Sequence, residues 1–501
     1  MEYLATNYLD SSAERFPDKI AFVAENSKIT FFELRERAKN LSRTKELAER
    51  TNEPIMVLMD KGIDCIVAFM GILYSGNFYV PIDVKSPYNK IQQIRDILDA
   101  EIIITDQEEY EIYEGKVDGA ECVRYSECIQ DNYCNKSMQR VIDADTAFVI
   151  FTSGSTGEPK GVVVSHKALM SYIEWGAKAF GFNQDTVFGN QTPFYFSMSI
   201  MDIYQTLRNG ASMVILKKKV FSFPVRLLDT LIDNKVNTIY WVPTAMCNVA
   251  NSGALEKRDC SCIKKVLFAG EVMPAKQLNI WRKELGEDVL FANLFGPTEV
   301  TDICCYYVID REFKDDEKIP IGVACENTSV IVLDKNNNEI IKPNVKGELC
   351  VKGTILSSGY YNNIAQTNRA FVQNPINRHY PETIYRTGDV VYYNEKGELM
   401  YECRLDWQIK HQGHRIELGE IEAVGSSIEG IDRCCCLYDS SKKQIVLFFS
   451  GYNEDFSSIV ENMKKKMPQY MVPQRIERLD EMPYNSNGKI DRKKLKELFN
   501  S

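Results

Sequence analysis

Short apolar runs recur through the first part of the chain, and segments with helical spacing separate them. Between the third and fourth runs, Val225 to Ile232 has the apolar spacing of a helix that lies on a sheet. Strands that alternate with helices predict α/β layers in which the strands are largely buried. The runs are Ile55 to Met59, Ile102 to Thr105, Met213 to Leu216, Thr238 to Val242, Val266 to Ala269 and Val289 to Ala292.

The pattern changes after about residue 320. Val330 to Leu333 precedes the turn-forming Asp334 to Asn338, and Val390 to Tyr393 precedes Asn394 to Gly397. These pairs of segments predict hairpins, so a smaller β-rich subdomain is expected to follow the α/β part.

The last hundred residues have a mixed pattern of their own. We expect a helix at Leu418 to Ser427, a strand at Gln444 to Phe449 and a second helix at Phe456 to Met467. A chain of 501 residues exceeds one ordinary core, so two or three units are expected. The predicted fold class is α/β, with a small α+β lobe at the C-terminal end.

Charge and cysteine usage exclude several classes of protein. The net charge of −10 argues against binding to nucleic acid, which normally requires a basic face. The 15 cysteines contain no C-x₂-C pair, and the four histidines form no ligand cluster with them, so we expect small buried thiols in a reducing compartment. Met1 to Leu4 does not open a signal peptide, and no apolar run is long enough for membrane insertion. The sequence predicts a cytoplasmic protein.

The segment from Phe151 to Gly161 is rich in glycine and hydroxyl side chains and lies between two predicted strands. Glycines leave backbone N–H groups open to phosphate oxygens, hydroxyls add donors, and Lys160 supplies a positive charge. The segment differs from a P-loop because its lysine precedes Gly161 and no helix is predicted to follow directly. It predicts a polyphosphate site; the alternative is a polar hairpin turn.

Four further segments follow this loop: Leu294 to Glu299, Tyr385 to Asp389, Arg404 to Glu422 and Asn487 to Arg492. Together the five resemble, in order and spacing, the signature of the adenylate-forming superfamily, and the resemblance covers nearly the whole chain. That superfamily includes nonribosomal peptide synthetase adenylation domains, D-alanine–carrier protein ligases, acyl-CoA synthetases and luciferases. The overall pattern is closest to stand-alone D-alanine–carrier protein ligases and amino-acid adenylation domains.

The resemblance implies a core at residues 1–404 that binds ATP and an acid, and a mobile lobe at residues 405–501 that carries a catalytic lysine. It also implies a reaction in two steps. A carboxylate attacks the α-phosphate of ATP, which releases pyrophosphate and leaves an acyl-adenylate. A thiol then attacks this mixed anhydride. Because the first step joins two anions, its catalysis rests on positioning and charge neutralisation.

The resemblance assigns ATP-binding roles residue by residue. Phe295 corresponds to the aromatic ring that stacks on adenine, Asp389 to the carboxylate that takes both ribose hydroxyls, and Glu299 to the Mg²⁺ ligand. Thr298 and Lys489 join Glu299 as catalytic residues, and the lysine bridges carboxylate and phosphate oxygens in the adenylation step only. The remaining ATP-binding positions are Thr152, Ser153, Gly154, Ser155, Thr156, Gly157, Lys160, Gly270, Glu271, Asn293, Leu294, Gly296, Tyr401 and Arg404.

For the second step, the resemblance makes Asp406 part of a hinge and Lys410, Gly413 and Arg415 part of a tunnel for the thiol. Gly413 would let the backbone approach a pantetheine arm. The chain has no Gly-Gly-x-Ser carrier motif. We therefore expect the thiol to come from a phosphopantetheinylated carrier protein in trans or from coenzyme A.

Ser197 is the main departure from the amino-acid-activating relatives. Their residue at this position is an aspartate that pairs with the substrate's α-ammonium, and a serine hydroxyl cannot neutralise that charge. Ala269 stands where D-alanine ligases often have cysteine. The other pocket positions describe an apolar slot with one phenol and one carboxylate: Met198, Met201, Tyr240, Leu267, Leu294, Asp302 and Ile303.

Asp302 is interpreted as an acceptor for an amine or hydroxyl remote from the substrate's carboxylate; the alternatives are a helix N-cap or a surface aspartate. The first interpretation favours a β- or ω-amino acid, or an aryl acid such as a hydroxy- or aminobenzoate. The leading hypothesis is thus a stand-alone adenylation enzyme that loads such an acid onto a carrier protein. The alternatives are a D-alanine–carrier ligase, an acyl-CoA synthetase and a binding protein without catalysis. The last is disfavoured because the phosphate loop, Glu299, Asp389 and Lys489 occur together.

The role assigned to Lys489 can be tested by separating the two steps. Lys489→Ala should abolish adenylate formation, measured by ATP–pyrophosphate exchange, because the cation between the two anions is lost. Transfer from a preformed adenylate to the thiol should be spared. An equal loss in both steps would contradict the assignment.

Overall fold

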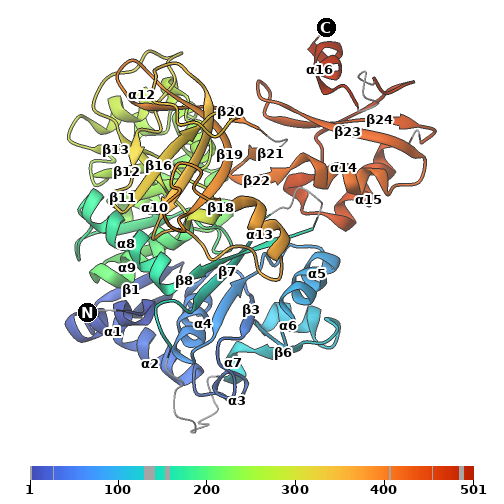
Figure 1. Ribbon diagram of the computed structural model, residues 1–501. Helices are drawn as coiled ribbons and strands as arrows, with labels where there is room; N and C mark the ends of the chain where they lie inside the picture. The colour runs from blue at the N-terminus through green and yellow to red at the C-terminus, as the bar shows by residue number, and fades with distance from the viewer. Residues whose placement is uncertain are drawn as a thin grey trace. The chain divides into compact units, whose positions relative to one another are not determined.

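The computed structural model describes residues 3–25, 27–128, 141–152, 158–405, 408–453, 455–483 and 490–500. The chain forms two compact units (Figure 1). The first comprises Met1–Val84, Ile97–Ile150 and Gly161–Leu405, and the second comprises Lys85–Asp96, Phe151–Lys160 and Asp406–Ser501. The division into lobes of 1–404 and 405–501 stays a prediction, since the second unit also takes in two N-terminal segments.

A nine-stranded sheet forms the centre of the first unit. Its strands from β13 to β1 run parallel, and antiparallel strands close both edges. The order is β15 (Val323–Ala324), β14 (Cys305–Val308), β13 (Leu290–Phe295), β12 (Lys265–Phe268), β11 (Thr238–Trp241), β9 (Val187–Asn190), β10 (Ser212–Ile215), β1 (Ile20–Ala24) and β2 (Ser27–Thr30).

A second, six-stranded sheet accompanies it. Pairing is parallel from β6 through β5, β3 and β4 to β7. The order is β6 (Glu121–Arg124), β5 (Ile102–Thr105), β3 (Pro54–Leu58), β4 (Phe78–Pro81), β7 (Thr146–Thr152) and β8 (Lys160–Ser165). The apolar runs predicted as buried strands are confirmed as β3, β5, β10, β11, β12 and β13.

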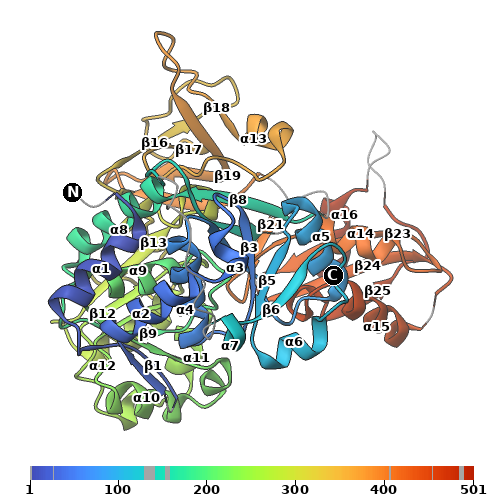
Figure 2. The same ribbon diagram turned by 90° about the horizontal axis from the view of Figure 1, so that it is seen from below.

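Helix α4 (Ile63–Tyr74) contacts strands of both sheets, β3 and β4 of one and β1 and β2 of the other. Every residue of this helix except Asp64 is buried, as expected of a helix that is apolar all round. Figure 2 shows it among the other helices of the first unit. These are α1 (Ala5–Arg15), α2 (Phe31–Leu41), α3 (Lys45–Ala48), α6 (Gln107–Tyr113), α7 (Tyr125–Cys128), α8 (His166–Phe180), α9 (Ser199–Asn209), α10 (Pro224–Asp233), α11 (Pro243–Asn251), α12 (Ala275–Leu285) and α13 (Ile364–Ala370).

The predicted β-rich subdomain is a five-stranded antiparallel sheet. Its strands are β16 (Thr328–Leu333), β17 (Gly347–Gly353), β19 (Thr383–Tyr393), β18 (Phe371–Gln373) and β20 (Leu399–Arg404), which pairs with β19. The predicted strand at Val390 to Tyr393 is the end of the longer β19. The connection from β16 to β17 extends beyond the predicted turn, because Glu339 and Ile340 first fold back onto β16.

The second unit contains the expected α+β elements. A hairpin of β21 (Gln408–His411) and β22 (His414–Glu417) precedes a three-stranded sheet. The sheet consists of β23 (Ile431–Asp439), β24 (Gln444–Gly451) and β25 (Arg475–Arg478), and the helices of this unit are α5 (Tyr88–Leu98, whose last two residues belong to the first unit), α14 (Leu418–Ser426), α15 (Phe456–Lys466) and α16 (Arg492–Asn500). Strand β24 and the helices α14 and α15 were expected from the sequence.

The cysteines behave as small hydrophobic residues. All those that the structure describes with their side chains are free thiols, and most are buried. Cys403, on β20, is exposed. Within the described ranges, no helix combines the length and apolar character that a membrane span requires.

One backbone approach at the edge of the large sheet gives a stability test. Gly322 has φ = +83°, and an added Cβ would lie 2.1 Å from the carbonyl oxygen of Tyr306. Gly322→Ala should therefore lower the melting temperature by several degrees. The matched control is Gly397→Ala. Gly397 has a similar φ of +76°, and an added Cβ would have nothing within 4 Å, so this variant carries the cost of the positive φ angle without a steric clash. Equal melting temperatures for the two variants would contradict the steric argument.

Candidate functional site

The predicted acid-binding residues gather where parallel strands of the large sheet end. Tyr240 of β11 pairs in register with Leu267 of β12, so their side chains leave the same face, and Leu294 of β13 follows on the next strand. Carboxyl ends of parallel strands are the usual ligand-binding edge of such sheets. Met198, Met201, Tyr240, Leu267, Ala269, Leu294 and Ile303 are all buried.

The turn after β13 brings the polar residues to this edge. A Cβ at Gly296 would lie 2.2 Å from the carbonyl oxygen of Asp302, so the chain can fold back only over a glycine. The backbone N–H of Cys304 then donates to the carbonyl of Phe295 at 2.9 Å. Within this turn, Thr298 and Glu299 lie in a single 3₁₀ turn (Thr298–Val300).

Asp302 is neither a surface aspartate nor a helix N-cap. It is buried, and three hydroxyl groups donate to its carboxylate: Ser197 to Oδ1 at 3.0 Å, and Tyr172 and Tyr240 to Oδ2 at 2.7 and 3.0 Å. Burial, followed by the nearby charge of Asp302, holds the pKa of both phenols well above the usual range. Thr298 donates to the Ser197 hydroxyl at 3.4 Å and so links this cluster to the predicted catalytic turn.

Glu299, within the same turn, is fully buried. Its Oε1 accepts a hydrogen bond from the phenol of Tyr360 at 2.8 Å, and its carbonyl accepts one from the backbone N–H of Ser357 at 2.9 Å. Tyr360 in turn forms a bridge with Val162 of β8, the strand that follows the phosphate loop. Glu299 is therefore tied to the segment that carries the predicted phosphate site.

The described residues contain no cluster of three or more side chains that could enclose a metal ion. Mg²⁺ usually keeps waters and binds one or two carboxylates together with substrate phosphates. A single buried carboxylate, Glu299, fits an ion of that kind.

Four of the predicted adenosine-binding residues lie in two pairs. The rings of Phe295 and Tyr401 have centroids 5.7 Å apart, and Arg404 lies 3.1 Å from Asp389 in a buried ion pair. Glu271 accepts a hydrogen bond from the backbone of Thr244 at 2.8 Å. Asn293 is buried and donates to the carbonyl of Pro320 at 2.8 Å, and a Cβ at Gly270 would touch the sulfur of Met198 at 3.4 Å. The segment assigned to adenine therefore borders the acid-binding residues.

The phosphate loop is described only at its ends. Thr152 closes β7, and its Oγ1 is buried without a hydrogen-bond partner in the described structure. Lys160 opens β8, is 9 % exposed, and lies 3.9 Å from Glu417 within the second unit. Ser153, Gly154, Ser155, Thr156 and Gly157 lie outside the described residues.

The predicted thiol-tunnel residues belong to the β21–β22 hairpin. Lys410 and Arg415 are register partners, and Gln412 and Gly413 form the turn with φ of +52° and +81°. Two positive φ angles characterise the tight hairpin turns that favour glycine, so the turn alone accounts for Gly413. Lys489 and Asp406 lie outside the described residues.

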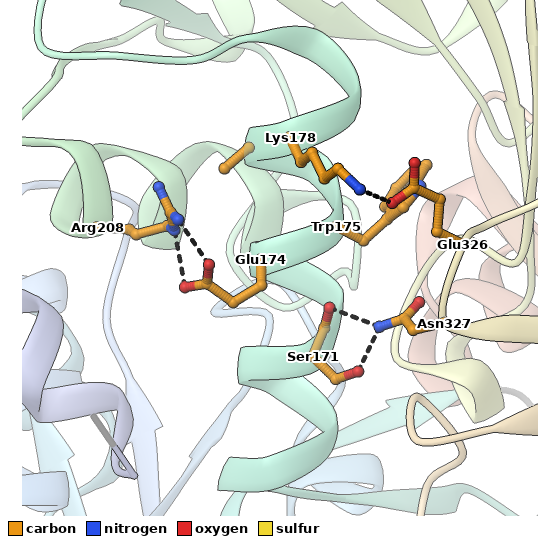
Figure 3. A pocket seen from close by; sticks show the side chains of 8 residues that line it. Ser171, Glu174, Trp175, Lys178, Arg208, Glu326 and Asn327 are labelled. Atoms are coloured by element: carbon orange, nitrogen blue, oxygen red, sulfur yellow. Dashed lines mark hydrogen bonds and ion pairs between the residues drawn. The ribbon is translucent and has the colours of Figure 1, made fainter. Parts of the chain in front are cut away.

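A cavity of about 530 Å³ lies away from these residues, along α8 (Figure 3). Its charged groups pair with one another: Arg208 with Glu174, Lys178 with Glu326. Asn327 donates to the carbonyl of Ser171 at 2.9 Å. Because the charged and polar groups that line this cavity already pair with one another, we take the residues at the carboxyl ends of the parallel strands as the candidate active site.

The chain belongs to the AMP-binding enzyme family, whose model matches residues 9–361. It is 30% identical to zwittermicin A synthase ZmaJ of Bacillus cereus over 96% of this chain and 92% of that protein. It is also 30% identical to the D-alanine–D-alanyl carrier protein ligase of Lacticaseibacillus casei (strain BL23), over 97% of both chains. Several other relatives are longer synthases, of which this chain spans less than half.

The fold is also that of known adenylation proteins. A nonribosomal peptide synthetase protein with adenylation and PCP domains, 23% identical, superposes with a TM-score of 0.83 over 98% of this chain and 84% of that one. The predicted fold class is confirmed by this likeness. The family match and the carrier protein ligase relative confirm the predicted superfamily, and the protein is an adenylate-forming ligase.

Sequence reasoning missed two tyrosines of the site. Tyr172 lies in α8 and Tyr360 lies between β17 and α13, each far along the chain from the carboxylate that it contacts. Neither belongs to a motif, and from the sequence alone a buried tyrosine cannot be distinguished from an ordinary residue of the hydrophobic core.

Tyr360→Phe tests whether the buried Glu299 needs its donor. The loss of a hydrogen bond to a charged group, worth about 1.5–3 kcal/mol, should slow pyrophosphate exchange at least about tenfold and raise the Mg²⁺ concentration required for half-maximal rate. Tyr361→Phe is the matched control, since this neighbour donates to the carbonyl of Gly161 through its backbone N–H, which the substitution keeps. An unchanged Mg²⁺ dependence in Tyr360→Phe would contradict the proposed link.

Proposed function

We propose that this protein uses ATP and Mg²⁺ to convert a carboxylic acid into an acyl-adenylate and then transfers the acyl group to the phosphopantetheine thiol of a separate carrier protein. The observation that supports this most is the turn from Gly296 to Asp302. It unites Thr298, Glu299 and a buried carboxylate at the ends of parallel strands.

In the first step, an oxygen of the acid attacks the α-phosphorus of ATP, and the bond to the leaving pyrophosphate breaks. Asp389 suits the ribose hydroxyls because carboxylate oxygens accept from both, and Arg404 at 3.1 Å holds that carboxylate in place. Phe295 and Tyr401 offer aromatic surface for the adenine. A bound Mg²⁺ would neutralise phosphate charge, with Glu299 as its protein ligand.

The role of Lys160 requires an exchange of partners. Its ammonium lies 3.9 Å from Glu417, and both side chains are nearly buried. A polyphosphate carries more negative charge than one carboxylate, so the phosphates of ATP can replace Glu417 as the partner of the Lys160 ammonium. Glu420 of α14 lies near this pair. Burial raises the pKa of its carboxyl group, and it forms an ion pair with Lys90 at 3.6 Å.

The carrier in trans is supported by two of the relatives, which are named for a D-alanyl carrier protein. They also support the second candidate, a D-alanine–carrier protein ligase with an altered ammonium site. The likeness to o-succinylbenzoate CoA synthetase of Bacillus subtilis, at 20% identity, concerns the fold alone.

For the acid, we propose one without an α-amino group, either a β- or ω-amino acid or an aryl acid. Ser197 carries no charge for an α-ammonium, whereas the neighbouring Asp302 offers a buried acceptor. Pyrophosphate exchange over a panel of α-, β- and ω-amino acids, benzoates and fatty acids tests this. Strong exchange with D-alanine would favour the second candidate. Carrier loading compared with coenzyme A acylation then identifies the thiol.

Asp302→Asn keeps the size of the side chain and removes its charge. It should reduce kcat/KM for the native acid far more than for an analogue without the remote polar group, because only the former loses an interaction. The two values come from exchange assays on the matched pair of acids. A uniform loss would show that Asp302 serves the fold and not the substrate.

A further inference from the structure

The carboxylate of Asp302 is fixed in orientation by residues from three separate elements. Tyr172 of α8 and Tyr240 of β11 both donate to Oδ2, at 2.7 and 3.0 Å. Oδ1 is left toward Ser197, whose hydroxyl lies 3.0 Å away just before α9. The two tyrosines therefore decide which oxygen faces the predicted substrate position.

Tyr172 is itself held firmly. The indole of Trp175, one turn along α8, packs against its ring with centroids 6.0 Å apart and planes 26° apart. Figure 3 shows Trp175 on α8, where it also lines the cavity of about 530 Å³ described above. The same indole meets Tyr306 of β14 edge-on at 5.3 Å. Tyr172 thus has little freedom to turn its hydroxyl away from Asp302.

The hydrogen-bond donors at the carboxylate of Asp302 are hydroxyl groups. Three hydroxyl donors stabilise a carboxylate more than a neutral acid, and both phenols are fully buried. A second buried carboxyl, Asp202 of α9, has its pKa raised to about 8, chiefly by burial, with the charge of Asp302 among the further causes.

A buried negative charge beside an apolar slot selects for a positive group. Met198 follows Ser197 in the chain and Leu267 is the register partner of Tyr240. Both, like Met201, are buried side chains that offer no hydrogen bonds. An acid without an amine would bring only its own negative charge toward Asp302, which is unfavourable in a medium of low polarity. An ammonium group would form a charge-assisted hydrogen bond with Oδ1.

The position of Asp302 relative to Ser197 bears on where the substrate amine would lie. Oδ1 lies 3.0 Å from the Ser197 hydroxyl, the position near which the resemblance places an α-ammonium partner in relatives. An ammonium group that contacts Oδ1 as well as the Ser197 hydroxyl would therefore lie farther along the substrate than an α-ammonium group.

We propose that Oδ1 of Asp302 and the Ser197 hydroxyl form a two-part receptor for a substrate ammonium group, that Tyr172 is the positioning residue that aims this carboxylate, and that the substrate is a β- or γ-amino acid. The inference rests on the proposed function and narrows it, because it excludes acids without a cationic amine.

The first test compares matched acids in pyrophosphate exchange with the full chain. The probes are β-alanine, 3-aminobutyrate, β-phenylalanine and 4-aminobutyrate against their analogues without the amine, with D- and L-alanine and benzoate alongside. At least one β- or γ-amino acid should exceed its own analogue in kcat/KM about a hundredfold, as one charge-assisted pair allows. Preference for benzoate, an amine-free acid or alanine would overturn the inference and leave the ligase function standing. No exchange with any acid would overturn the proposed function as well.

Tyr172→Phe tests the positioning role. It should raise KM for the preferred amino acid about tenfold and leave the value for its amine-free analogue unchanged, because only the amine uses Oδ1. The matched control is Tyr204→Phe, which removes a buried phenol that hydrogen-bonds Tyr79 at 3.1 Å. The two variants should lose similar thermal stability, and only Tyr172→Phe should change the ratio between the two acids. An unchanged ratio in Tyr172→Phe would overturn the positioning role.

Moving the charge provides a third test. The double variant Ser197→Asp, Asp302→Asn carries its carboxylate at the other position of the receptor. It should shift the preference at least tenfold toward an α-amino acid, even if its overall rate is low, since a ratio is insensitive to a general loss of activity. A double variant that binds ATP and keeps the original preference would show that Asp302 does not contact the amine.

Discussion

The site depends on one close approach of the backbone to itself. Gly296 has no side chain, so the carbonyl of Asp302 can occupy the place where any Cβ would stand. The five residues between them must then form a compact turn, and Thr298, Glu299 and Asp302 all lie at the edge of the parallel strands. A larger residue at Gly296 would push the return strand away and separate these groups.

A shared principle runs through the buried carboxylates of the first unit. Glu299 and Asp302 each accept hydrogen bonds from a tyrosine hydroxyl of a distant element. Asp389 instead pairs with the guanidinium of Arg404. Burial of a charge is expensive unless donors satisfy it, and phenols achieve this without adding a cation that would compete with a metal ion or an ammonium group.

The sequence predicted β3, β5 and β10 to β13 of the two sheets because each is a short apolar run, and it predicted the turn from Gly296 to Glu299 because the motif is local. It also marked Asp302, but it could not tell a buried acceptor from a helix cap. That distinction depends on Tyr172 and Tyr240, which lie 130 and 62 positions away in the chain. Hydrogen bonds across such separations leave no periodic or compositional trace. The assignment of Tyr360 to Glu299 was hidden for the same reason.

The distribution of thiols has a practical side. Nearly all described cysteines are shielded within the cores, and burial raises the pKa of many, including Cys65, Cys350 and Cys436, which slows their reaction with electrophiles. Cys403 is exposed and directly precedes Arg404. Among the described thiols, a maleimide dye would therefore attach there first. A fluorescent reporter could therefore be attached beside the Asp389–Arg404 pair without introducing a new cysteine.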